Sequence, residues 1–466
     1  MVPGDEVAGS GSAAASPDPN RPPPEREQDL GEGGEATAAI PVVRRLAGIG
    51  VGLGAVGFLL WLRGQPGLAE ALYGSGPLAV LPRWLSQATG VVPVSLAELF
   101  VVAVLGRQML GVTRGIRTAS RPLHRATPGL LLRGALRLGQ DAGVLLALFA
   151  LLWGGQYARP GLEARLGLAD PGRVEVTELE GLARMAVEEA NRYYEEIHGS
   201  DDSGRPTPRA GGDELRPELD AAWSAVALRH GFPDRAAQPH GPAKGFLLTP
   251  LMRPFGVAGM YFPFTGEALL LADLPGVLFP KEKAHEMAHQ RGFASESDAN
   301  ALAFLVAREA DDPRIRYSAY VFLQNQLLGT LVPLDPERAR AVMEERAPGV
   351  VRDLEDRARY WAVARGWTRW VGLSLNDLML RAHGVPEGVA SYQGSVRVFV
   401  ALARAQGPDG LRPPSRGPMS PHSRRSPTAV PPASSAGFLN WSGEWGRLEG
   451  FRLGSSTPNQ TPRPPG

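Results

Sequence analysis

Three long apolar runs occupy the first third of the chain, and arginine bounds the first of them on both sides. They cover residues 46–62, about 84–106 and about 142–158. A membrane-spanning helix needs about 20 mostly apolar residues, and aromatic side chains such as Trp153 and Tyr157 suit the membrane interface. The pattern predicts a membrane region of three transmembrane helices over residues 38–158. Core helices of a soluble protein are the alternative, because glycine or proline interrupts two of the runs.

Arginine is concentrated between the second and third runs. Residues 107–137 contain seven arginines and no acidic residue, whereas the preceding link, residues 64–83, has one acid and one base. The positive-inside rule places the basic link in the cytoplasm and therefore everything after residue 158 outside. A basic patch for nucleic acid is the alternative, but the net charge of +1 gives no overall attraction to such a partner. We expect a lipid bilayer and no nucleic acid as partners.

Polar tails precede and follow the structured part of the sequence. Residues 1–37 and 407–466 are rich in glycine, proline and serine and show no sustained apolar periodicity. Segments of this kind bury too little apolar surface to offset the entropy of ordering, so both tails are predicted to be disordered. Residues 159–406 remain as one soluble domain, which is long enough to form its own core.

The predicted soluble domain is mostly helical with a small sheet. Apolar residues recur at helical spacing near residues 175–198 and 218–229, whereas residues 245–271 contain short apolar stretches around a Pro/Gly turn. After Pro280 the helical pattern continues almost to Ala405. The fold class is thus three N-terminal transmembrane helices followed by an α+β domain.

The residues of this domain that carry chemistry form the motif HExxH, at His285, Glu286 and His289. Residues four apart lie about 40° apart around a helix, so both imidazoles can bind one Zn²⁺. Glu286 is the predicted general base, which accepts a proton from a zinc-activated water and passes it to the leaving amine. The chain has no cysteine, so thiolate ligands and disulfides are excluded.

A catalytic zinc ion needs a third protein ligand, and Glu296 is the predicted one. Asp298 is the rival ligand, or else it supports the ligands from outside together with Asn300. Ser295 stands where a third histidine would indicate a metzincin, so a gluzincin-like set of two histidines and one glutamate is favoured. A surface helix with two solvated histidines is the alternative, and an intramembrane protease is excluded by the many charges of this segment.

Two further elements of such a site are less defined by the sequence. A substrate can add a strand to the edge of a sheet, and the candidate residues for that strand are Gly259, Tyr261, Phe262, Phe264 and Thr265. A hairpin that only packs its aromatic residues into the core is equally compatible. The candidate residues for stabilising the oxyanion are Tyr317, Tyr320, His383 and Tyr392.

Several stretches resemble a bacterial membrane family named domain of unknown function 3810, whose members look like zincin peptidases behind three N-terminal spans. They are residues 259–268 (GMYFPFTGEA), 285–294 (HEMAHQRGFA), 296–300 (ESDAN), 316–318 (RYS), 376–378 (NDL) and 391–392 (SY). The resemblance covers residues 46–406 and implies a zincin-like domain with one zinc ion. By this resemblance, the second acid of the family's EDEAN-like motif is Asp298 here, which is a conservative departure from the family pattern.

The sequence therefore predicts a multi-pass protein of the bacterial cytoplasmic membrane, with a zinc metallopeptidase domain on the extracytoplasmic side. Its expected reaction is hydrolysis of a peptide or protein substrate. One alternative is a non-catalytic membrane sensor or assembly factor that retains the fold. The presence of Glu286 disfavours it, because a structural metal site needs no base beside the metal.

Overall fold

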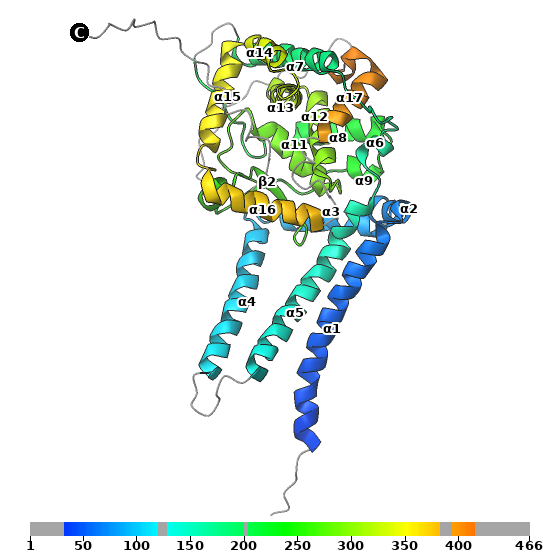
Figure 1. Cartoon of the computed structure of the whole chain (residues 1–466), viewed down its shortest axis with the longest axis vertical. Helices are drawn as coiled ribbons and strands as arrows, with labels where there is room; N and C mark the ends of the chain where they lie inside the picture. The colour runs from blue at the N-terminus through cyan, green and yellow to red at the C-terminus, as the bar shows by residue number, and fades with distance from the viewer. Residues whose placement is uncertain (1–31, 120–127, 200–203, 383–393, 415–466) are drawn as a thin grey trace, which may run out of the picture.

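Three long helices extend from one side of a larger helical body (Figure 1). The computed structural model describes residues 32–119, 128–199, 204–382 and 394–414. The long helices are α1 (Glu32–Leu62), α4 (Leu96–Ala119) and α5 (Pro128–Leu152). Each contains a stretch of at least 21 residues that is apolar enough to cross a membrane, and at most 11% of the residues in its most apolar window are buried. The prediction of three helices that are long and apolar enough to span a membrane is therefore confirmed.

The boundaries of these helices differ from the predicted ones. The second apolar run divides into α3 (Val80–Gly90) and α4, because the link between them contains Pro93 and does not continue the helix. The third span, Leu132–Leu152, starts earlier than predicted, and the predicted end of that span is a buried 3₁₀ turn, η3 (Gly154–Ala158). Helix α1 begins at Glu32, inside the segment 1–37 for which no structure is predicted; residues 1–31 lie outside the described residues.

The basic link between the second and third spans is largely helical. Arg114 and Arg117 lie near the end of α4, and Arg133 and Arg137 lie near the start of α5, so only residues 120–127 fall outside the described helices. All of these arginines are at the ends remote from the soluble body (Figure 1). The basic charge thus marks one end of the membrane helices.

Ion pairing and close packing hold the three spans together. The Nη2 atom of Arg107 on α4 lies 2.8 Å from the carboxylate of Asp141 on α5. Helices α1 and α5 approach closely at Gly52, where an added Cβ would lie 2.4 Å from the Cα of Gly143. Small residues at such crossings allow backbones to meet without the hydrophobic effect, which does not operate between helices in lipid.

We expect Gly52→Leu to lower the midpoint of thermal unfolding of the detergent-solubilised chain by several degrees. The added side chain must separate α1 from α5, and overpacking of this kind costs about 1–3 kcal/mol. Gly54→Leu is the matched control, because a Cβ there meets no atom within 4 Å. Equal melting of the two variants would contradict the predicted α1–α5 contact.

Short elements connect the long apolar helices to the larger helical body, at the ends of the helices that adjoin it (Figure 1). They are α2 (Pro66–Ala69), the π-helical turn η1 (Glu70–Gly74), η2 (Pro77–Ala79) and α3. Tyr73 in η1 donates a hydrogen bond to the carbonyl of Ala150 on α5 (2.7 Å), and the Ser86 hydroxyl on α3 accepts one from the amide of Gly241 (3.0 Å). The link between the first two spans is therefore part of the folded body.

The sheet contains β1 (Lys244–Gly245), β2 (Gly259–Phe262) and β3 (Glu267–Leu270), in the order β1-β3-β2. Strand β2 is antiparallel to β3, with Gly259 opposite Leu270, and among the described residues no strand pairs with its other edge. Glu267 on β3 is buried and accepts hydrogen bonds from the amides of Leu96 (3.1 Å) and Ala97 (2.6 Å) at the start of α4. The sheet is thus attached to the second span.

Helices α7 (Val176–His198), α11 (Phe279–Gln290), α12 (Glu296–Glu309) and α13 (Pro313–Leu331) form the core of the soluble body. The predicted helices near residues 175–198 and 218–229 are confirmed as α7 and α8. The other described helical elements of this body are α6 (Leu162–Arg165), α8 (Arg216–Arg229), α9 (Asp234–Ala237), α10 (Thr249–Met252), η4 (Arg253–Phe255), α14 (Pro336–Glu344), α15 (Pro348–Trp361), α16 (Gly366–Ala382), α17 (Gly394–Gln406) and η6 (Pro408–Leu411).

The folded body continues beyond residue 406, where the sequence predicts a disordered tail to begin. Leu411 in η6 is fully buried, and its carbonyl accepts a hydrogen bond from the Tyr320 hydroxyl (2.8 Å). Arg412 forms ion pairs with Glu188 and Glu189 on α7. Residues 415–466 lie outside the described residues, so the predicted tail is described only in its first part.

Candidate metal centre

Helix α11 carries the HExxH motif through the middle of the soluble body. Pro280 occupies its first turn, where no backbone hydrogen bond is lost, and Gly292 turns the chain after its end with a φ of 87°. Every residue of the helix is buried, including its lysines and glutamates. A helix with so many charges can be buried only when each charge finds partners.

The two histidines and one glutamate converge at one point. The Nε2 atoms of His285 and His289 lie 3.2 Å apart, and they lie 3.2 Å and 3.7 Å, respectively, from the carboxylate oxygens of Glu296. Ligands bound to a tetrahedral Zn²⁺ at about 2.0–2.1 Å are about 3.3 Å from one another. The spacing and the chemistry of these three donors therefore fit a single metal ion.

The start of α12 brings Glu296 to the histidines. Ser295 caps this helix by accepting a hydrogen bond from the amide of Asp298, so Glu296 is the first helical residue. A short turn through Gly292 joins α11 to α12 and directs this first residue back toward the preceding helix. Asp298 points elsewhere, since its carboxylate accepts a hydrogen bond from the amide of Leu162 (3.1 Å).

The hydrogen bond of His289 directs its free nitrogen toward the site. Its Nδ1 atom lies 2.7 Å from the carbonyl of Phe293, which can only accept, so Nδ1 carries a proton and Nε2 is the nitrogen that would bind a metal ion after losing its own proton. The Nδ1 atom of His285 is buried, and the described residues provide no hydrogen-bond partner for it. The two ligands therefore differ in how firmly their rings are oriented.

Burial and charge act on the pKa values of the site in opposite directions. Burial lowers the pKa of His285 and raises that of Glu286 well above its ordinary value. Burial also opposes the charged form of His289, but the carboxylate of Glu296 overcomes it and raises the pKa of this histidine to about 9. The charge of His289 in turn keeps the pKa of Glu296 low despite burial. The cluster thus places an anionic ligand beside its imidazoles.

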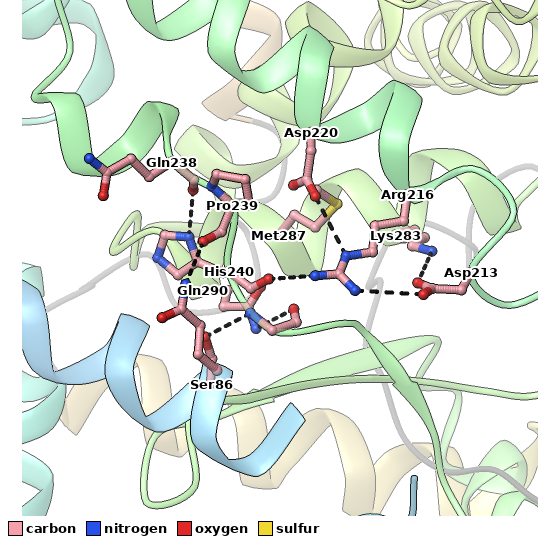
Figure 2. Close-up of polar contacts among 12 residues, drawn as sticks. Ser86, Asp213, Arg216, Asp220, Gln238, Pro239, His240, Lys283, Met287 and Gln290 are labelled. Carbon is pink, nitrogen blue, oxygen red and sulfur yellow. Dashed lines mark hydrogen bonds and ion pairs between the residues drawn. The ribbon is translucent and has the colours of Figure 1, made fainter. Parts of the chain in front are cut away.

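The opposite face of α11 is anchored by polar contacts (Figure 2). Lys283 donates to the carbonyl of Gly212 (2.6 Å) and lies 3.7 Å from Asp213, and burial lowers its pKa to about 8. The guanidinium of Arg291, just after the helix, lies 2.8 Å from Asp220. These contacts satisfy the buried charges and fix the rotation of α11 about its axis, which determines where the histidines point.

The remaining residues proposed to support the metal lie in other contacts. Asn300 accepts a hydrogen bond from the ammonium group of Lys281 (2.8 Å). The pKa of Asp298 is raised to about 7, mainly by burial and to a smaller extent by the negative charge of Glu163. The structure thus brings Glu296, and not Asp298, to the two imidazoles.

The predicted oxyanion residues are not brought to the site by the described structure. The hydroxyl of Tyr317 donates to Asp353 (2.8 Å), and that of Tyr320 donates to the carbonyl of Leu411. Both tyrosines belong to the main hydrophobic core. His383 and Tyr392 lie outside the described residues.

Strand β2 lies against the side chain of Glu286. A Cβ on Gly259 would come within 2.6 Å of the Cγ of Glu286, so only glycine permits this approach. The amide of Leu271 donates to the carbonyl of Ala258, and antiparallel pairing alternates, so the backbone groups of Gly259 and Tyr261 face the unpaired edge. The aromatic side chains also pack, since Phe262 and Phe264 contact Phe100 of α4. Both interpretations of this strand thus find support.

Two residues from the end of the third span border the cluster of His285, His289 and Glu296, and the sequence alone did not identify them. The ring centroid of Trp153 lies 6.1 Å from that of His289 and 4.6 Å from that of Tyr261. Burial and the charge of Glu296 raise the pKa of Tyr157 in the same aromatic cluster. Their only signal in the sequence was an aromatic cluster at the end of an apolar run, which also fits the membrane interface.

Comparison with protein families gives one match over most of the chain. Residues 73–400 match the model described as "Protein of unknown function (DUF3810)". The chain belongs to this family. The match covers the three strands, the HExxH helix and Glu296, as well as α4 and α5, so the family model includes most of the described body and two of the three long apolar helices. Searches of curated proteins and of solved structures give no match.

We expect Trp153→Ala to destabilise the DUF3810 protein by about 3–5 kcal/mol, the usual cost of removing a buried tryptophan from a core. Trp153 directly follows α5, is 5% exposed and packs against the rings of Tyr261 and His289. The free energy of unfolding can be measured by urea titration in detergent. Trp61→Ala is the control, because Trp61 is 55% exposed on α1. A similar loss in both variants would mean that Trp153 is no part of a packed junction.

Proposed function

We propose that this protein is a membrane-anchored zinc metallopeptidase that hydrolyses peptide bonds. The observation that carries the proposal is the convergence of His285, His289 and Glu296 at the spacing of tetrahedral zinc ligands. Glu286 lies on the same helix as the two histidines and is buried beside β2. A donor set of two histidines and one glutamate next to a second carboxylate is the zincin arrangement of the gluzincin type.

Zn²⁺ held by these residues would supply a Lewis acid that polarises a peptide carbonyl and lowers the pKa of a water molecule. Glu286, which is buried beside β2 on the helix that carries both histidines, accepts the proton of the attacking water and delivers it to the leaving amine. Tyr157 and Tyr261 belong to the aromatic cluster that contacts His289 through Trp153, and their hydroxyls are the candidate donors that would stabilise charge on the carbonyl oxygen.

The peptide substrate would bind to the unpaired edge of β2. The backbone amides and carbonyls of Gly259 and Tyr261 face that edge, and β2 passes directly beside Glu286. An extended peptide that pairs with this edge gains main-chain hydrogen bonds and is held parallel to the site. This binding mode would select extended polypeptides.

The soluble part would lie on the extracytoplasmic side of a bacterial cytoplasmic membrane. Arg114, Arg117, Arg133 and Arg137 all lie at the ends of α4 and α5 that are remote from the soluble part. The positive-inside rule assigns those ends to the cytoplasm.

We expect the purified full chain to contain about one zinc ion by elemental analysis, since three protein ligands are present. Glu296→Ala should lose most of this zinc, because only two ligands remain. Asp298→Asn should retain it, since Asp298 is turned toward Leu162. Zinc retention by Glu296→Ala, or its absence from the unchanged chain, would refute the proposed ligand set.

We expect Glu286→Gln to keep its zinc and to lose peptidase activity by a factor of about 10²–10⁴, the usual contribution of a general base. The assay is the release of fluorescent peptides from fluorescein-labelled casein by the full chain in proteoliposomes. The control is Glu282→Gln on the same helix, whose carboxylate is paired with Lys281 (3.4 Å). If the zinc-loaded chain cleaves no faster than Glu286→Gln, the protein is instead a non-catalytic zinc-binding membrane protein.

A further inference from the structure

Two tryptophans project from helix α16 without cover from the described residues. Trp367 is 72% exposed and Trp370 is 68% exposed, and their spacing of three places both on one face of the helix. Neighbouring large aromatic side chains that remain exposed on a soluble surface mark a site of interaction.

The contacts of α16 place it next to the outer end of the second span. It packs on η4, which directly follows α10. The segment between β1 and α10 is hydrogen-bonded to α4, since Glu98 accepts hydrogen bonds from the amides of Leu247 (2.9 Å) and Leu248 (3.1 Å). Figure 1 shows α16 lying across the direction of α4, at the edge of the soluble part from which the spans extend.

Other exposed apolar side chains occur around the same end of α4. Trp84 on α3 is 66% exposed, Val91 on the link to α4 is 82% exposed, and Leu251 on α10 is 60% exposed. Together with α16 they form what we call the underside patch: Trp84, Val91, Leu247, Leu248, Leu251, Trp367 and Trp370. Leu247 and Leu248 donate backbone hydrogen bonds to Glu98 at the start of α4. Leu251 follows them on α10, and Trp84 and Val91 precede α4 in the chain.

The charge of α16 is compatible with a lipid surface. Residues 361–382 contain three arginines, Arg365, Arg369 and Arg381, and one acidic residue, Asp377, so the segment has a net positive charge. A helix that carries tryptophan on one face together with arginine suits the headgroup region of a bilayer, where aromatic rings lie at the interface and arginine contacts anionic lipids.

We propose that the underside patch is embedded in the headgroup region of the same bilayer that α1, α4 and α5 span, with α16 lying in the plane of the membrane. The occupant is the lipid surface, because the first residue of the second span, Leu96, follows Val91 by only five residues. The patch therefore lies at the level where α4 enters the lipid. This assignment does not depend on the peptidase activity or on zinc.

The consequence concerns the position of the candidate metal centre. Phe262 and Phe264 contact Phe100 of α4, and Trp153 joins the end of α5 to His289. With α16 in the interface, the edge of β2 lies close to the membrane surface. The site would then reach polypeptide segments adjacent to the bilayer more readily than distant ones.

The absence of cysteine from the chain allows a direct test with single spin labels. The full chain with Trp367→Cys or Trp370→Cys is labelled and reconstituted in vesicles of phosphatidylethanolamine and phosphatidylglycerol. Power saturation then compares collisions with oxygen, which concentrates in lipid, and with a water-soluble nickel chelate. Leu334→Cys is the control, because Leu334 is 56% exposed and precedes α14 at the opposite end of the soluble part (Figure 1).

We expect oxygen to exceed the nickel chelate as a relaxant at residues 367 and 370, and the reverse at residue 334. Water-like accessibility at both tryptophan positions would overturn the proposal. Spin–spin broadening at these positions that disappears on dilution with unlabelled protein would overturn it as well, since a second copy would then cover the patch.

A second measurement covers the case in which a cysteine variant does not fold. Brominated phospholipids quench tryptophan at the depth of their bromine atoms, and the Trp367→Phe/Trp370→Phe double variant keeps aromatic rings at both positions. With bromine near the headgroups, we expect the quenched fraction of the fluorescence to be smaller in the double variant than in the unchanged chain. An equal quenched fraction would contradict the proposed depth.

Discussion

The carboxylate of Glu267 is the interaction on which the position of the soluble part depends. It is buried and accepts hydrogen bonds from Lys244 on β1, from the Thr265 hydroxyl (2.8 Å), and from two amides at the start of α4. A buried carboxylate is costly unless all its partners are present, and the N-terminus of a helix is a favourable place for an anion. One side chain therefore joins strands β1 and β3 of the sheet to the start of the second span.

The sheet transmits this position to the candidate metal centre. Strand β3 pairs with β2, and Gly259 on β2 lies against the side chain of Glu286. Glu286 is on α11, and on the opposite side of that helix Lys283 and Arg291 form ion pairs with Asp213 and Asp220 (Figure 2). Removing one partner from a buried pair leaves an uncompensated charge, so few rotations of α11 are tolerated. The histidines are thus oriented by contacts on the far side of their own helix.

The region of three long apolar helices also contributes contacts to the candidate metal centre. Trp153 packs between α5 and His289, and Arg159 donates to the carbonyl of Gly292 (2.9 Å) and pairs with Glu70 (2.9 Å). The contacts of Trp153 with His289 and of Arg159 with Glu70 cross residue 158, where the sequence suggests a domain boundary. A fragment that begins at residue 159 would lack Trp153 and Tyr157 and would leave Arg159 without its ion pair, so the full chain is the appropriate unit for experiments.

The sequence by itself determined the features that depend on local periodicity. Spans of about 20 apolar residues, the helices near residues 175–198 and 218–229, and the shared face of His285 and His289 all follow from the geometry of one helix. The tertiary structure alone decided between Glu296 and Asp298, because both are at the start of α12 and only the turn at Gly292 sets their direction. It also decided that Trp153 and Tyr157 belong to the site and not merely to the membrane interface. Contacts between residues more than a hundred positions apart depend on how elements pack, and no local pattern records that packing.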